Sequence, residues 1–135
     1  MDARQKDIAR RCAEAAESGA MTFPQAVGAL IEAGFEGYFV DLRRGTITYY
    51  LPNGECVEYP GDKPAVSAQP GFDAAVVKDA IREAQQLVPG YTYKGFCAKV
   101  AGAGCVGYQV SFPGRRVVYL GRNADTHTEH FPGSQ

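Results

Sequence analysis

Apolar positions in the first third of the chain follow a helical period. They recur every three or four positions over the range Asp2–Ser18, and Gly19 marks the end of this predicted helix. The spaced residues are Ile8, Cys12, Ala15 and Ala16. A second helix is predicted to begin at Thr22, because Thr22 and Gln25 have the spacing of a capping box and Pro24 is tolerated in a first turn. Its expected buried stripe consists of Val27, Leu30 and Ile31.

The period then changes from helical to alternating. Three short strands are predicted around residues 38–42, 47–51 and 55–59, where apolar and polar side chains alternate. The turn sequences Arg43-Arg44-Gly45 and Pro52-Asn53-Gly54 separate them, and Asn-Gly is typical of a tight hairpin. The first sixty residues therefore predict two helices followed by an antiparallel meander.

The second half predicts the same order of elements. A helix over Asp73–Val88 is followed by a shorter one from about Thr92 to Ala103, and three strands are expected around residues 108–112, 116–120 and 126–131. The apolar side of the longer helix consists of Val77, Ala80, Ile81, Ala84 and Leu87. Residues 61–72 between the halves are rich in Pro and Gly and form a linker by composition.

A shift of 70 residues brings the two halves into register. Over the 32 positions of the range Thr22–Asn53, eight residues are identical to those 70 positions later. After Asn123 the second half carries two additional residues in this alignment, so that Tyr59-Pro60 meets Phe131-Pro132. We therefore predict an α+β fold built by internal duplication of a helix–helix–strand meander. Repeat 1 (1–60), the linker (61–72) and repeat 2 (73–132) are expected to form one pseudo-two-fold domain over 1–135, with its antiparallel sheet packed against the helices.

Composition narrows the function classes. The 135 residues have a net charge of −1, which argues against a general nucleic-acid binder, and no stretch is apolar enough to cross a membrane. The first residues lack the apolar core of a secretion signal, so a cytoplasmic protein is expected. The four cysteines contain no C-x-x-C pair and are predicted to be free and mostly buried.

The last predicted strand departs from its counterpart in the first half. Aligning Pro60 with Pro132 places Glu129 opposite Val57 in the alignment, and His127 shares a strand face with Glu129. A buried carboxylate needs a partner, and a His127/Glu129 pair could act as general base and orienting group or bind a small polar ligand. The alternative is an edge strand with both faces in solvent, on which these side chains are merely hydrated.

Several neighbours of this pair complete the candidate ligand-binding set. Its members are His127, Glu129, His130, Tyr119, Asp125 and Arg122. A strand sends His127 and His130 to opposite faces, so neither a metal nor another cofactor is expected. Arg43-Arg44 and Arg115-Arg116 fall near equivalent turns, where they are solvated or contact a phosphate or a partner. Cys105 stands where the first half has Phe35; either Phe96 fills the lost volume or a pocket opens there.

Three motifs in the second half carry a resemblance to a known group of proteins. They are the runs 104–110 (GCVGYQV), 117–122 (VVYLGR) and 126–132 (THTEHFP). With them the chain resembles the YbcV-like uncharacterised bacterial family, which often bears the label "phage envelope protein". The resemblance implies a small soluble α+β protein with no established activity, cofactor or catalytic residues.

Three classes of function remain open at this point. The first is a non-enzymatic binding or interaction module, whose partner is a second copy of the chain or a small polar ligand; Phe39, Tyr50 and Tyr59 are candidate interface aromatics. The second is a small hydrolytic or acid–base enzyme that uses His127 and Glu129. The third is a phage-related structural component.

Overall fold

The computed structural model describes residues 1–132, which form four helices and one antiparallel sheet of six strands. The elements are α1 (Ala3–Ser18), α2 (Phe23–Glu32), β1 (Gly37–Asp41), β2 (Thr46–Tyr50), β3 (Cys56–Pro60), α3 (Ala74–Gln86), α4 (Tyr93–Gly102), β4 (Cys105–Ser111), β5 (Arg116–Gly121) and β6 (Thr126–His130). The strand order is β3-β2-β1-β4-β5-β6, and every neighbouring pair is antiparallel. The predicted α+β class is confirmed.

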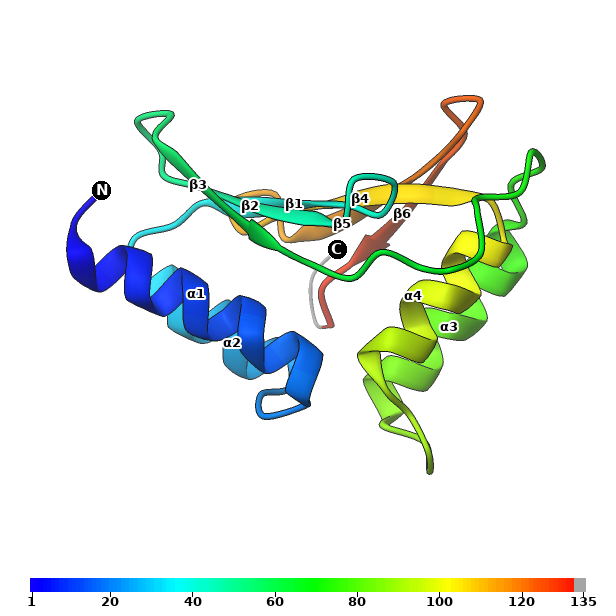
Figure 1. Ribbon diagram of the computed structural model, residues 1–135, viewed down its shortest axis with the longest axis horizontal. Helices are drawn as coiled ribbons and strands as arrows, with labels where there is room; N and C mark the ends of the chain where they lie inside the picture. Colours follow the sequence, from blue (N-terminus) through cyan, green and yellow to red (C-terminus); the bar gives the residue numbers. More distant parts are fainter. Residues whose placement is uncertain (133–135) are drawn as a thin grey trace.

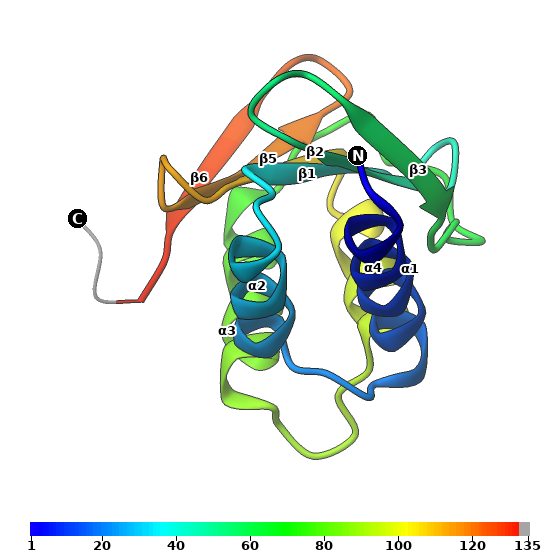
Figure 2. The ribbon, with the colours of Figure 1, turned by 90° about the vertical axis from the view of Figure 1, so that its left-hand side faces the viewer.

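All four helices lie on one face of the sheet (Figure 1). The pair α1/α2 lies toward one end of the sheet and the pair α3/α4 toward the other, and α1 also contacts α4. The view along the other direction shows the same layering, with no helix over the outer face (Figure 2). Antiparallel sheets commonly keep one face in solvent in this way. The chain therefore has a helix-covered face, which holds the core, and an uncovered face.

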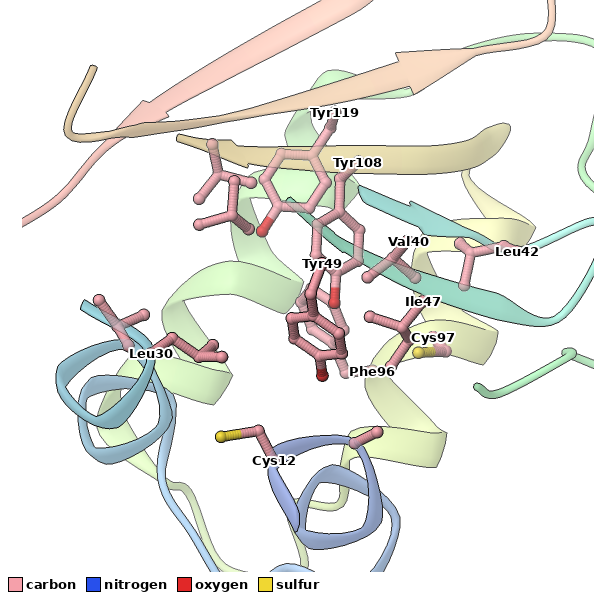
Figure 3. Packing of buried hydrophobic residues seen from close by; sticks show 14 of the residues in the cluster. Cys12, Leu30, Val40, Leu42, Ile47, Tyr49, Phe96, Cys97, Tyr108 and Tyr119 are labelled. Atoms are coloured by element: carbon pink, nitrogen blue, oxygen red, sulfur yellow. The ribbon is translucent and has the colours of Figure 1, made fainter. Parts of the chain in front are cut away.

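The core lies between the sheet and the helices and is rich in tyrosine. Its most deeply buried side chains include Leu30, Val40, Val77, Val100, Val110, Cys97 and Cys105. Three of the rings at its centre, those of Tyr49, Tyr108 and Tyr119, project from three strands toward the helices (Figure 3). The hydroxyls of Tyr93 and Tyr108 lie 2.7 Å apart and share a hydrogen bond. Helix and strand periods thus converge on a single cluster of buried residues.

Two predicted core positions are wrong. Ile31 is 52% exposed, because the buried stripe of the short helix α2 is narrower than predicted and holds only Val27 and Leu30. Leu87 is 55% exposed, because α3 ends one residue earlier and Leu87 takes a left-handed capping conformation with φ of 47°. A side chain at a helix C-cap leaves the apolar stripe of the helix that precedes it.

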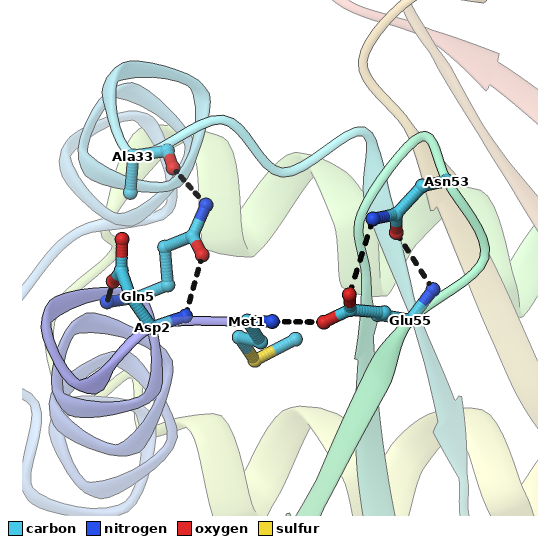
Figure 4. Close-up of polar contacts among 6 residues, drawn as sticks. All are labelled: Met1, Asp2, Gln5, Ala33, Asn53 and Glu55. Atoms are coloured by element: carbon cyan, nitrogen blue, oxygen red, sulfur yellow. Dashed lines mark hydrogen bonds and ion pairs between the residues drawn. The ribbon is translucent and has the colours of Figure 1, made fainter.

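The start of α1 is tied to the rest of the first half (Figure 4). Asp2 and Gln5 form a capping box, as Thr22 and Gln25 do at α2, where the prediction is confirmed. The Gln5 side chain also donates to the Ala33 carbonyl, 3.0 Å away. The amino group of Met1 contacts the Glu55 carboxylate beside the β2–β3 turn. These contacts join the beginning of α1 to the end of α2 and to the sheet.

The strand pairing shows that the predicted alignment of β6 is wrong. His127 pairs with Tyr119 as Val57 pairs with Tyr49, and Glu129 pairs with Val117 as Tyr59 pairs with Ile47. The spacing of 70 therefore continues to the end of β6 without two additional residues. The reason is that the same number of residues separates the last paired positions of the two hairpins, Tyr50 with Cys56 and Leu120 with Thr126. Ala124 adopts the left-handed conformation (φ 65°) that Gly54 adopts in the first half (φ 91°). The duplication itself stays a prediction from the sequence.

The linker is packed against the second half. A Cβ added to Gly104 would lie 2.2 Å from the carbonyl oxygen of Gly71, so only glycine permits this close approach. The Phe72 ring lies against Gly121, the strand partner of Cys105. Phe72 therefore fills space beside Gly121, while Cys105 lines a concavity with the linker, which agrees with the predicted alternative of a pocket at that position. Phe96 instead packs edge-on against Tyr108 and Tyr119.

Candidate functional site

The His127 and Glu129 side chains form a hydrogen-bonded pair on the helix-facing side of the edge strand β6. Nε2 of His127 lies 3.0 Å from Oε2 of Glu129, and the two side chains are 16% and 33% exposed. Strand alternation places both on the face that carries Tyr119 of the neighbouring strand, and the Tyr119 ring centre lies 6.4 Å from the imidazole centre. The pair is therefore neither fully hydrated nor sealed in the core.

Aromatic rings lie next to the pair on the neighbouring strand and just after the end of β6. Phe131 packs edge-on against Phe23 at the beginning of α2, with 5.9 Å between ring centres. On the neighbouring strand, burial raises the pKa of the Tyr119 hydroxyl well above its usual value, and the Glu129 charge adds to that rise. Tyr119 is therefore a neutral hydroxyl at physiological pH. The pair sits at the boundary between this apolar cluster and solvent.

The hydrogen bond defines which atoms of the pair are left for a ligand. An ionised carboxylate can only accept, so the proton of the bond is carried by Nε2 of His127. In the neutral imidazole, Nδ1 is then an acceptor, and Oε1 of Glu129 is a second acceptor. Within residues 1–132, neither side chain has a hydrogen bond to a serine, threonine, cysteine or lysine. The arrangement can orient an imidazole and accept hydrogen bonds, and it lacks a positioned nucleophile.

The other predicted site residues lie elsewhere. His130 is exposed on the opposite face of β6, and Asp125 is exposed in the β5–β6 turn. Arg122 is in the same turn, and its Nη1 donates to the Ala68 carbonyl in the linker, 3.0 Å away. The structure therefore brings together only His127, Glu129 and Tyr119. No cluster of three potential metal ligands occurs within residues 1–132.

The predicted cysteine and aromatic roles are resolved differently. All four cysteines are free and three are buried, as predicted. Burial raises the pKa of Cys97 to about 12, which keeps that thiol protonated and a poor nucleophile.

Of the candidate interface aromatics, Phe39 and Tyr50 lie on the uncovered sheet face, but Tyr59 turns toward α1 and donates to the Lys6 carbonyl. Tyr59 is thus a core-edge residue, because its hydroxyl finds a backbone partner there.

A concavity separate from the His127–Glu129 pair lies where the linker passes the β1–β2 and β5–β6 turns. It encloses about 420 Å³ and is lined by Leu42, Arg43, Lys63, Pro64, Val66, Ser67, Ala68, Ala101, Cys105 and Arg122. We call it the linker hollow. Sequence reasoning had noticed Arg43 and Arg122 separately, but Lys63 was missed. No local pattern joins these residues, because they meet only after the linker folds back across the turns.

The fold defines a small α+β protein, and comparison with known families shows which family it belongs to. The chain matches, over residues 11–128, the family described as "Protein of unknown function (DUF1398)", and it belongs to that family. The match supports an uncharacterised family and carries neither the YbcV-like nor the phage-envelope label. No curated protein matches the chain at a significant level. Within residues 1–132, no helix has both the length and the apolar character that crossing a membrane requires.

Proposed function

We propose that the protein is a non-enzymatic binding module that receives a small hydrogen-bond-donating ligand at the His127–Glu129 pair. The observation that carries this proposal is the register of the two edge strands. At the positions where β3 presents Val57 and Tyr59 toward the helices, β6 presents His127 and Glu129. An apolar residue and a tyrosine satisfy packing at such positions, whereas a half-buried carboxylate costs solvation free energy.

The chemistry of the pair defines the ligand class. With the proton on Nε2, the pair offers Nδ1 of His127 and Oε1 of Glu129, both of which are acceptors. Each of these acceptors can receive one N–H or O–H group, so the pair suits a ligand with donors spaced along a short carbon skeleton, such as a diamine, an amino alcohol or a polyol. The aromatic neighbours Tyr119 and Phe131 provide a surface for its carbon skeleton.

One observation favours a second candidate, an acid–base or hydrolytic enzyme. The Glu129 carboxylate orients the His127 imidazole as a positioning residue orients a general base. Asp125, the other carboxylate of the predicted candidate set, lies in the exposed turn, however, and contributes nothing to the pair. The binding role requires fewer groups than the enzymatic role, and all of its groups are present.

The test is a titration of ¹⁵N-labelled protein with ethylenediamine, ethanolamine and glycerol. We expect at least one of them to shift the resonances of β6 and of Tyr119 saturably. In His127→Gln and Glu129→Gln the shifts should be lost, whereas His130→Gln, on the opposite face of the same strand, should bind as the unchanged protein does. At a ligand concentration of one hundred times Kd, binding should also stabilise the fold by about 2.7 kcal/mol.

The proposal is wrong if none of the three probes shifts these resonances, or if His127→Gln binds them as well as the unchanged protein. Turnover of an ester or amide panel that requires both His127 and Glu129 would favour the enzyme instead.

A homodimer is a further proposal, supported by Phe39 and Tyr50 on the uncovered face of the sheet. Light scattering after size exclusion, at several concentrations, tests it; a monomer throughout would exclude it.

A further inference from the structure

We propose that the linker hollow binds a phosphate monoester that carries a compact apolar group. The site is separate from the His127–Glu129 pair and does not depend on the function proposed there. The observation that carries it is that three cationic residues from distant segments, Arg43, Lys63 and Arg122, line one concavity of about 420 Å³. Concavities of this size are typical of sites for small molecules.

The three cations come from segments that are distant in sequence and fixed in space. The backbone of the Arg43 turn is held by Asp41, whose Oδ1 accepts from the N–H groups of Arg43 and Arg44 at 3.0 Å each. Lys63 packs closely against the β1–β2 turn. A Cβ added to Gly45 in that turn would lie only 2.9 Å from the Cβ of Lys63. These two contacts fix the two backbones from which the side chains extend.

The β5–β6 turn fixes the third cation and the linker together. Arg122 donates to the Ala68 carbonyl at 3.0 Å, and Asn123 donates to the Pro70 carbonyl at 3.2 Å. The linker backbone N–H of Gln69 in turn donates to the Ala101 carbonyl in α4. The wall of the hollow is therefore anchored on both sides, which keeps the ordering cost of binding low.

The charges of the hollow are unbalanced within the described part of the chain. Within residues 1–132, no aspartate or glutamate lines it and none of its three cations is in an ion pair. The nearest carboxylates along the chain are Asp41, whose Oδ1 is bound to the turn backbone, and Asp62, which is buried next to Lys63. The chain as a whole has 14 Lys and Arg against 15 Asp and Glu, so the grouping of these three cations is no consequence of a general basic excess. A dianion would offset the positive charge of these residues, and guanidinium groups match the geometry of phosphate oxygens.

The remaining wall defines the rest of the ligand. Pro64 and Val66 of the linker give it an apolar surface, with Val66 49% exposed, while Leu42 and Ala101 are buried beneath it. A fully hydrated ion such as free phosphate would leave this surface uncovered. A phosphate ester whose organic part is small and apolar uses both the cations and the wall.

The test compares phenyl phosphate, inorganic phosphate, benzoate and phenol by calorimetry and ¹⁵N chemical-shift titration. We expect phenyl phosphate to bind most tightly and to shift resonances of the linker and of both turns. Arg43→Gln and Lys63→Met should each weaken phenyl phosphate binding about tenfold, the loss of one charge-assisted contact. The matched control is Arg44→Gln, which removes the same charge from the same turn, one residue outside the hollow, and should change the Kd by less than about twofold.

Several outcomes would overturn the proposal. Equal weakening by Arg43→Gln and Arg44→Gln would mean that the ligand responds only to net charge. Benzoate or phenol binding as tightly as phenyl phosphate would exclude phosphate as the recognised group, and inorganic phosphate binding as tightly would exclude the apolar wall. His127→Gln should leave phenyl phosphate binding unchanged, so failure here is distinguishable from failure at the β6 pair.

Discussion

The hydrogen bond between the Tyr93 and Tyr108 hydroxyls allows a quantitative test of the core. The two oxygens lie 2.7 Å apart, Tyr108 is only 6% exposed, and burial raises the pKa of both hydroxyls well above its usual value. Tyr108→Phe leaves the Tyr93 hydroxyl buried without this partner. Such a loss costs about 1–3 kcal/mol. We expect about 1.5 kcal/mol, because the Cys97 thiol is a second, weaker partner for Tyr93.

The assay is a double-mutant cycle in urea. Tyr93→Phe and Tyr108→Phe should each lower the free energy of unfolding, and the double variant should lose less than the sum, since no hydroxyl is then left unpaired. In thermal unfolding, the single variants should melt roughly 6 °C lower, at about 4 °C per kcal/mol for a chain of this size. Additive losses, with a coupling free energy below about 0.3 kcal/mol, would refute the reasoning.

Two further predictions concern the linker and the buried tyrosines. Gly104→Ala should lower the free energy of unfolding in urea by about 3 kcal/mol or more, because the new Cβ would meet the Gly71 carbonyl. The control Gly54→Ala, with a similar φ and open space around it, should cost only about 1 kcal/mol. Equal losses would contradict the packing of Gly104 against Gly71. Alkaline pH should unfold the protein, because burial raises the pKa of Tyr91 to about 12 and raises those of Tyr38, Tyr49 and Tyr119 as well. An unfolded tyrosine titrates near pH 10, so stability present below about pH 10 is lost as the pH rises toward the folded pKa values. Phenolate absorbance should therefore rise together with the loss of circular dichroism. Phenolate absorbance that rises well before unfolding would contradict the burial of these tyrosines.

Local patterns predicted most of the elements. The capping residues Thr22 and Gln25 placed the beginning of α2 correctly, and the turn residues Asn53-Gly54 separated β2 from β3 as expected. These features depend on neighbours in the sequence, which is why sequence reasoning finds them. Ile31 and Leu87 were placed wrongly because the width of a buried stripe depends on what packs against it.

Features that depend on distant contacts were not predictable. The β6 register was missed because Ala124 adopts a conformation that glycine normally provides, and its sequence gives no sign of this. The packing of Phe72 against Gly121, and the convergence of Lys63 with Arg43 and Arg122, follow from the folded path of the linker. The proximity of His127 and Glu129 was predicted from strand alternation alone, although the alignment that first drew attention to them was displaced by two residues.

We infer that His127 and Glu129 are present on β6 for binding, at a cost in stability. The most direct measurement gives β6 the residues of β3, with the double substitution His127→Val and Glu129→Tyr, and follows both urea unfolding and ligand titration. We expect a free energy of unfolding that is unchanged or higher by about 1 kcal/mol, because sites kept for function rarely optimise stability, together with loss of diamine or polyol binding. A loss of more than about 1 kcal/mol in stability, or binding that survives the substitution, would contradict this inference.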